Sequence, residues 1–155
     1  MFGDHRDHQL FESLPGAGKA LAPRLLAAMG SDRNRFELAI EIQQLSGIAP
    51  VTESSGKSSW VHRRQACPVF LRQTFHEFAK ESIKQSAWAR AFYDQQRAKG
   101  NQHNAALRSL AFKWIRIIFR CWKDSVPYDA CLTPSCQMRG VESLTPQDAT
   151  DCSGV

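Results

Sequence analysis

Two neighbouring serines in a glycine-containing segment are the residues of this sequence best suited to chemistry. Ser54 and Ser55 precede Gly56-Lys57, and Arg63 and Arg64 follow within a few positions. A serine hydroxyl is a weak nucleophile near neutral pH unless a base, a metal or a strong electrophile assists it. Nearby cations can hold a phosphodiester and stabilise the charge that develops on its oxygens. The pattern suits phosphoryl transfer through a covalent seryl phosphate, although a polar linker with basic residues is the commoner origin of such a segment.

A second feature that could contact phosphate is the turn around Gly16 and Gly18. It precedes a helical pattern, so the segment has the form of a helix-hairpin-helix element. Small residues at such a turn let backbone N–H groups approach a phosphate closely, but a plain turn between helices explains the same residues. Neither this turn nor Gly56-Lys57 is a nucleotide-binding phosphate loop. The position that requires glycine, five residues before each Gly-Lys pair, holds Ser13 or Val51.

The positive charges of the chain are concentrated in one block. The net charge of all 155 residues is +5, whereas Lys57 to Lys123 contains fourteen Lys or Arg against three Asp or Glu. A concentrated basic block favours a polyanionic partner such as nucleic acid, and a solvated basic face without a partner is the alternative. Arg108, Lys113 and Arg116 lie on the polar faces of the strongest predicted helix, and we expect them to contact DNA or RNA.

Cysteines, histidines and hydropathy argue against other classes of function. Five cysteines cannot all pair within one chain, so a reducing compartment is the simpler explanation. Cys131 and Cys136 lack a second Cys or His pair at zinc-like spacing, and we expect no metal site in this chain. No apolar run approaches the roughly 20 residues that cross a bilayer, and the N-terminus does not resemble a secretory signal. We therefore expect a cytoplasmic protein that does not contact membranes.

Apolar periodicity predicts an all-α fold, a compact bundle of about five or six helices. The expected helices cover residues 8–14, 20–29, 36–45, 68–85, 87–99 and 104–122. Pro23 fits its helix only in the first turn, and Ser86 is typical of an N-cap. Residues 47–65 contain one Pro, two Gly and four Ser, so we expect an irregular or weakly extended Ser-Gly loop there. Residues 1–7 are expected to be an N-terminal extension, 8–129 the domain, and 130–155 a disordered tail.

Several separate segments, taken in order, are more specific than any single motif. Together they resemble the C-terminal domain of the insertion-sequence one-ten family (IS116/IS110/IS902 type) of bacterial, bridge-RNA-guided transposases. The resemblance covers residues 8 to 129, essentially all of the predicted fold. The segments that carry it are Leu14–Gly30 (LPGAGKALAPRLLAAMG), Gly47–Lys57 (GIAPVTESSGK), Cys67–Phe75 (CPVFLRQTF), Ala91–Gly100 (AFYDQQRAKG), Ala111–Arg116 (AFKWIR) and Pro127–Asp129 (PYD).

This resemblance implies a function well beyond what the residue types show. Members of the family join an N-terminal RuvC-like nuclease domain, with Asp-Glu-Asp-Asp carboxylates and magnesium, to a C-terminal domain that supplies a catalytic serine. A structured bridge RNA pairs with donor and target DNA, and strands are exchanged through a covalent serine–DNA intermediate by a homo-oligomer. The matching nucleophile in this sequence is Ser55, with Ser54 as the alternative. From their charge and place, the expected phosphate contacts near it are Lys57, Arg63, Arg64 and Arg72.

The sequence also departs from the family pattern. It begins almost directly on the C-terminal domain, so we expect the magnesium-binding carboxylates to lie elsewhere and this chain to need no cofactor of its own. Metal-assisted phosphoryl transfer requires such carboxylates, and we expect the chain alone to be inactive. Its partners would then be DNA, a structured RNA, and a separate nuclease domain or an intact transposase. Residues 130–155 do not resemble the family.

Two other hypotheses come from different classes of protein. One is a non-catalytic nucleic-acid-binding module, or a decayed remnant, that modulates an intact transposase. The other is a protein-interaction bundle that uses its aromatic side chains as a contact surface, although aromatic residues at helical spacing more often form a core. The aromatic residues concerned are Phe75, Phe78, Trp88, Phe92, Trp114 and Trp122.

Overall fold

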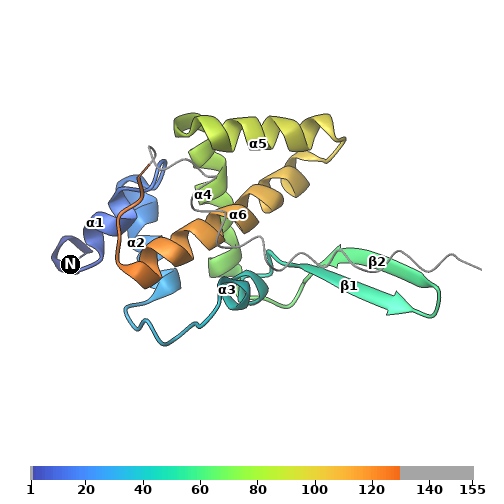
Figure 1. Cartoon of the computed structure of the whole chain (residues 1–155), viewed down its shortest axis with the longest axis horizontal. Helices are drawn as coiled ribbons and strands as arrows, with labels where there is room; N and C mark the ends of the chain where they lie inside the picture. Colours follow the sequence, from blue (N-terminus) through green and yellow to red (C-terminus); the bar gives the residue numbers. More distant parts are fainter. Residues whose placement is uncertain (1, 130–155) are drawn as a thin grey trace, which may run out of the picture.

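A computed structural model describes residues 2–129, apart from the side chain of Arg63; the predicted tail, 130–155, lies outside these residues. Six α-helices, one short 3-10 helix and one two-stranded sheet form the described part of the chain, so the predicted, mainly helical class is confirmed (Figure 1). The elements are η1 (Phe2–Asp4), α1 (His8–Glu12), α2 (Gly18–Met29), α3 (Ala39–Leu45), β1 (Pro50–Ser55), β2 (Ser58–Arg63), α4 (Val69–Gln85), α5 (Ala87–Ala98) and α6 (His103–Asp124).

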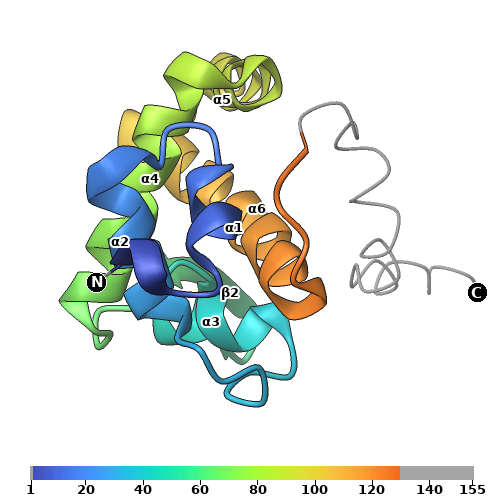
Figure 2. The same ribbon diagram turned by 90° about the vertical axis from the view of Figure 1, so that its left-hand side faces the viewer.

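Helix α6 is the centre of the bundle. It contacts α3, α4 and α5, while α2 packs on α4 and α1 packs on α2. Figures 1 and 2 show α6 crossing α4, with α1 and α2 at the end of the bundle opposite the strands. The core-facing stripe of α6 is buried, as its helical spacing predicts, and includes Leu107, Leu110, Trp114 and Ile118. Within residues 2–129, no helix combines the length and the apolar character that a bilayer-spanning segment requires.

The six aromatic side chains considered for a contact surface lie in this core or pack against it. Phe75, Phe78, Trp114 and Trp122 are fully buried, and Trp88 and Phe92 pack against the same cluster while partly buried. The Trp114 indole donates to Ser82 Oγ at 2.8 Å, and the Trp122 indole donates to the Gly30 carbonyl at 2.9 Å. Each buried indole N–H therefore has a partner, which removes the cost of burying it unpaired.

A buried ion pair fastens the N-terminal residues to the bundle. Asp7 is buried and accepts hydrogen bonds from Arg33 Nη2 at 2.6 Å and Arg33 Nη1 at 3.1 Å. The Arg33 guanidinium also lies over the Trp122 ring, 4.8 Å from its centroid. A bidentate arginine–carboxylate pair of this kind fixes geometry as well as supplying energy. Residues before α1 thus pack on the domain that follows them.

One expectation about helix ends needs correction, and another is confirmed. Helix α2 begins at Gly18, before the expected Ala20, so Pro23 lies in its second turn rather than its first. Since proline has no N–H, the Lys19 carbonyl does not receive the usual backbone hydrogen bond from four residues ahead. Ser86 does occupy the N-cap of α5, but its side chain makes no capping hydrogen bond. The other helices agree with the expected ranges to within a few residues, except that α3 begins only at Ala39.

The Ser-Gly segment, expected to be irregular or weakly extended, forms a β-hairpin, so the extended alternative is confirmed and the irregular one was wrong. Strands β1 and β2 pair antiparallel, from Pro50 opposite Arg63 to Ser55 opposite Ser58. The outer residues Thr52, Trp60 and Val61 are β-branched or aromatic types that suit a pleated strand. Of the glycines and serines that suggested an irregular segment, Gly56 lies in the turn and the four serines pair with one another at the tip. Figure 1 shows the hairpin projecting away from the helical bundle.

Candidate nucleic-acid interface and serine hairpin

The hairpin presents both candidate serines at its tip, but on opposite faces. A two-residue turn, Gly56-Lys57, joins Ser55 to Ser58, and Gly56 has a φ of 59°. A positive φ at the first turn residue is typical of a type II′ hairpin turn, which glycine adopts without steric cost. Successive side chains of a strand point to opposite faces. Ser55 therefore shares a face with Glu53 and Trp60, whereas Ser54 shares the other face with Thr52 and Val61.

Both faces of the hairpin are open to solvent. Ser54, Ser55 and Lys57 are exposed, and the apolar side chains Trp60 and Val61 remain 48% and 65% exposed. Within residues 2–129, neither serine hydroxyl forms a hydrogen bond with a histidine or carboxylate that could act as a base. The described part of the chain thus delivers the hydroxyl to a projecting position without activating it.

The predicted phosphate contacts around Ser55 are not brought together at the tip. The backbone of Arg63 pairs with Pro50, five strand residues from Ser55, which is about 16 Å along an extended strand. Arg64 follows β2 and is exposed, and Arg72 in α4 donates from Nη1 to Cys67 Sγ at 3.4 Å. Only Lys57 lies beside the serine. The arginines belong to the root of the hairpin.

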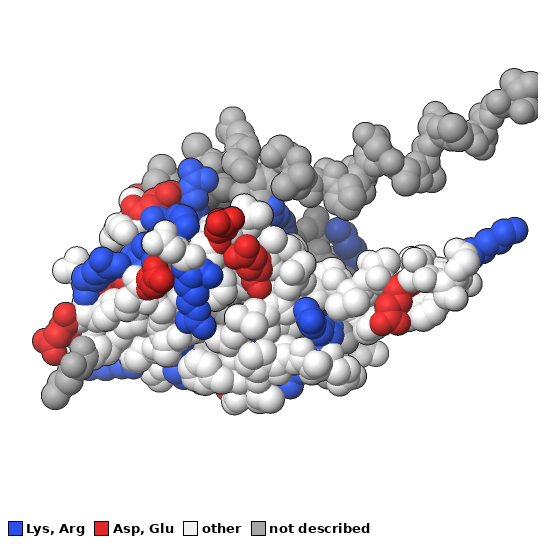
Figure 3. All heavy atoms as spheres, turned by 90° about the horizontal axis from the view of Figure 1, so that it is seen from below, with Lys and Arg blue, Asp and Glu red and all other residues white. Residues whose placement is uncertain are grey.

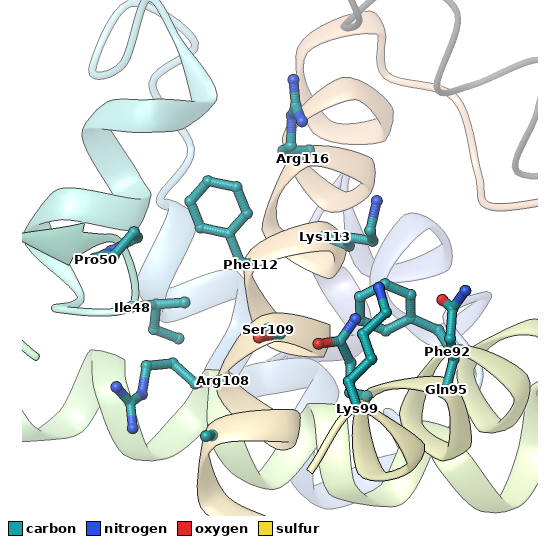
Figure 4. Close-up of a pocket in the computed structure, with 12 residues that line it drawn as sticks. Ile48, Pro50, Phe92, Gln95, Lys99, Arg108, Ser109, Phe112, Lys113 and Arg116 are labelled. Carbon is teal, nitrogen blue, oxygen red and sulfur yellow. The ribbon is translucent and has the colours of Figure 1, made fainter. Parts of the chain in front are cut away.

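A groove between α5, α6 and the segment before β1 does collect positive charge. It has a volume of about 650 Å³, and one face of each helix lines it. Helix α5 and its C-cap contribute Phe92, Gln95, Gln96 and Lys99, at the i, i+3, i+4 and i+7 spacing of a single helical stripe. Figure 4 shows Phe92, Gln95 and Lys99 on one side of α6, with Ile48 and Pro50 on the other. The lining residues from α6 are Ala105, Arg108, Ser109, Phe112, Lys113 and Arg116.

Charge in this groove is of one sign. Lys99, Arg108, Lys113 and Arg116 line it, and its lining within the described residues includes no Asp or Glu. Elsewhere the basic excess is diluted: Figure 3 shows acidic side chains among the lysines and arginines on the face of the bundle seen there, and few charges on the hairpin. Four cations of the Lys57–Lys123 block thus line a single surface in this groove.

Packing fixes the groove side chains from beneath. Lys113 Nζ lies over the Phe92 ring, 5.2 Å from its centroid, in a cation–π contact between the two helices. The carbonyl of Phe112 accepts a hydrogen bond from the buried Gln43 Nε2 at 2.8 Å, which ties α6 to α3. Partial burial lowers the pKa of the Arg116 guanidinium from its ordinary value.

The turn at Gly16 and Gly18 lies apart from both features, and its glycines have different surroundings. The Gly16 N–H donates to Gln85 Oε1 at 3.0 Å, and a Cβ at Gly16 would lie 2.9 Å from the backbone of Glu81 and Ser82. The close approach that Gly16 permits in this structure is therefore to α4. Gly18 is exposed at the start of α2, with open space around it. A role for either glycine in nucleic-acid binding stays a prediction.

Comparison with known proteins decides the family. Residues 8–94 match the family model described as "Transposase IS116/IS110/IS902 family", which is more than half of the chain. The chain belongs to this transposase family. The matched span begins at the first residue of α1, contains the whole hairpin and ends within α5.

Individual relatives extend the similarity across α6. The chain is 32% identical over 128 residues to the "Mini-circle putative transposase for IS117" of Streptomyces coelicolor, covering 83% of the chain and 31% of that protein. It is 29% identical over 133 residues to the IS900 uncharacterized 42 kDa protein of Mycobacterium paratuberculosis, covering 85% of the chain and 33% of the relative. The chain thus spans about a third of the length of these curated relatives.

Sequence reasoning missed half of the groove of this transposase domain. It selected Arg108, Lys113 and Arg116, which the structure brings together, but it did not select Lys99 or the two glutamines of α5. The two glutamines and Lys99 follow Phe92 at helical spacing, and this pattern could have indicated a shared helix face. It was overlooked because the charges were counted along the sequence and were not assigned to the facing sides of two helices.

The described residues do not fit a magnesium centre. Residues 2–129 contain no group of three or more His, Cys, Asp or Glu side chains placed to hold a metal ion. The magnesium that the family resemblance implies is bound by hard carboxylate oxygens, and such a donor set is not assembled in this part of the chain.

Proposed function

We propose that this chain is the serine-bearing, nucleic-acid-binding domain of a DNA transposase, and that Ser55 is its nucleophile. The observation that carries the proposal is the position of Ser55 at the exposed tip of a projecting hairpin, within the span that matches the transposase family. A nucleophile in that position can enter an active site built by another domain. The α5–α6 groove supplies an independent place for binding nucleic-acid phosphates.

The chemistry would be a phosphoryl transfer. Ser55 Oγ attacks the phosphorus of a DNA phosphodiester, and an Oγ–P bond forms as the bond from phosphorus to the leaving sugar oxygen breaks. The serine proton goes to a base, and the leaving oxygen takes up a proton. Since the described residues offer Ser55 no base, the partner nuclease domain would supply the activation. The isolated chain would then bind DNA and structured RNA but not join strands.

The opposite faces of the hairpin separate the two candidate serines. Only one face can point at a scissile phosphate when the hairpin docks in a given orientation. Ser55 adjoins the turn and Lys57, so it can lie closest to the phosphate while Lys57 contributes positive charge. Ser54 faces away from Ser55 and provides a matched control within the same strand.

The experiment is strand joining in a reaction reconstituted with the nuclease domain and the RNA, using wild type, Ser55→Ala and Ser54→Ala. We expect Ser55→Ala to abolish both joining and the covalent protein–DNA adduct while its affinity for nucleic acid stays within twofold of wild type. Ser54→Ala should retain both activities. Strand joining by Ser55→Ala at the wild-type rate would contradict the proposal.

A second candidate function is a non-catalytic module that binds nucleic acid and modulates an intact transposase. This function is favoured because, within residues 2–129, neither serine hydroxyl has a hydrogen-bond partner that could act as a base. The adduct distinguishes the two, because a module that only binds never becomes covalently attached to DNA under any complementation.

A further inference from the structure

We infer that the α5–α6 groove holds an unpaired nucleotide of a single-stranded nucleic-acid segment, rather than the backbone of a duplex. The inference deepens the proposed function and rests on it, because it specifies what the basic surface of this domain recognises. It is carried by the shape of the groove, by the kinds of side chain that line it and by the way they are held.

The shape favours a single nucleotide over a double helix. A concave volume of about 650 Å³ lies in the range of sites that enclose small ligands, roughly 300–1,000 Å³. Duplex DNA is a convex rod that receives protein elements in grooves of its own, about 12 Å wide for the major groove. A duplex can lie across the mouth of this groove but cannot fill it. A base and its sugar, unstacked from their neighbours, can.

The lining contains the groups that bases need as well as those that phosphates need. A surface that binds only phosphates requires cations, which Lys99 and Arg116 provide. This groove adds the amides of Gln95 and Gln96 and the hydroxyl of Ser109. Amide and hydroxyl groups both donate and accept hydrogen bonds, as the edges of unpaired bases do.

Phe112 is the aromatic side chain best placed to stack on a base. The other phenyl ring of the groove, Phe92, already carries Lys113 over its face. Phe112 is half-buried, its backbone is fixed by Gln43, and Figure 4 shows its ring projecting from α6 on the side of Ile48 and Pro50. Stacking on an aromatic ring tolerates any base, because every base has a π-face. The site would therefore bind unpaired strands with little sequence preference.

The test measures the affinity of the full chain for labelled strands of twelve nucleotides and for a blunt duplex of twelve base pairs, at one low salt concentration. The strands are oligo(dT) and oligo(U). We expect either strand to bind more tightly than the duplex. Tighter binding of oligo(U) identifies RNA as the source of the nucleotide, and tighter binding of oligo(dT) identifies DNA; both results support the inference.

Substitutions at Phe112 link that preference to the groove. Phe112→Leu keeps apolar bulk but removes the ring, and we expect strand affinity to fall at least about fivefold, the lower end of the effect of losing one stacked base. Duplex affinity should change less than twofold, and Phe112→Trp, which restores a ring, should bind strands like wild type. Phe119→Leu, a half-buried phenyl ring of α6 outside the groove, is the matched control.

Three results would overturn the inference alone, while leaving nucleic-acid binding intact. These are a duplex that binds as tightly as the strands, a Phe112→Leu effect equal on both probes, and displacement of the strand by polyglutamate at the same charge concentration. The last would mean that the groove recognises negative charge without recognising bases. Absence of binding to every nucleic acid, by chain shown to be folded by circular dichroism, would overturn the proposed function together with the inference.

Discussion

The two regions proposed to be functional in this domain are the hairpin and the α5–α6 groove, and they are built in opposite ways. The groove is the outer surface of two helices, and the inner face of α6 forms the core; its side chains are held by the packing beneath them. The hairpin has no layer beneath it, and its serines are held by one backbone ladder and a glycine turn. Under the proposed function, the binding groove is therefore preorganised in this chain, whereas the candidate nucleophile needs a partner to complete its surroundings.

A two-stranded hairpin on its own is at best marginally stable in water. Trp60 and Val61 are nevertheless exposed on opposite faces of this one. Docking against another surface would bury them and hold the serine in place at the same time. Such coupling between docking and ordering keeps a reactive hydroxyl from being fixed in an attacking position before the complete assembly has formed.

The largest expected effect separates two tryptophans, one from each region. Trp114→Ala empties a fully buried site and removes the hydrogen bond to Ser82, so it should lower the free energy of unfolding by about 3–5 kcal/mol. Trp60→Ala, on the exposed hairpin, should change it by less than about 0.5 kcal/mol. Denaturant unfolding followed by circular dichroism at 222 nm measures both. A comparable loss at Trp60 would show that the hairpin packs on the helical body instead of projecting freely from it.

An effect of intermediate size is the pH dependence of stability caused by Cys121 in the helical bundle. Burial raises the pKa of the Cys121 thiol to about 11 from an ordinary value of 9.0. Below pH 9 the thiol is protonated in both states; as the pH rises towards 11 the unfolded thiol ionises and the folded one does not, so stability is lost. The full loss would be on the order of 2–3 kcal/mol. Urea unfolding between pH 8 and 11 should show this slope in wild type, and Cys121→Ala should have a shallower one. Equal slopes would contradict the assignment.

The smallest effect compares two glycines that both have a positive φ. Gly56 in the hairpin turn and Gly100 between α5 and α6 both have positive φ, and a Cβ at either would meet no neighbouring atom. Alanine at each should cost roughly 1–2 kcal/mol of local strain. For Gly56→Ala, hydrogen exchange should accelerate only in the hairpin amides, with the unfolding midpoint unchanged. Gly100→Ala should lower the midpoint of the whole bundle. The same response at both positions would mean that hairpin and bundle unfold as one unit.

Much of the bundle was predictable because a helix with one buried face repeats apolar residues at helical spacing. The stripe from Leu107 to Cys121 identified α6, and glycine and proline marked most helix ends. The hairpin escaped prediction since its tip pairs serine with serine, which gives no alternation of apolar and polar residues along the strands. Pairing is decided there by the turn at Gly56 and by Trp60 opposite Glu53, contacts that are visible only once the register is known.

For the candidate sites, individual residues were easier to predict than their grouping. Arg63 and Arg72 are near Ser55 along the chain but belong to the root of the hairpin, because an extended strand carries the tip away. Arg116 and Lys99 are far apart in sequence but line one groove, because α5 and α6 are joined by a short turn and lie against each other. Closeness in sequence is thus a poor guide to closeness in space along an extended strand. The cations of α5 and α6 come together only through the packing of the two helices.

The most direct measurement is the salt dependence of nucleic-acid affinity for wild type, for Lys99→Ala with Arg116→Ala in the groove, and for Lys80→Ala with Arg90→Ala outside it. All three use the same labelled oligonucleotide, and the two variants lose the same charge. We expect the groove variant to lower the slope of log affinity against log salt by about 1.4–1.8, the share of two phosphate contacts. The outer variant should change it by less than half as much. Equal losses from both variants would show that the chain binds through diffuse positive charge, and that the groove is not its nucleic-acid interface.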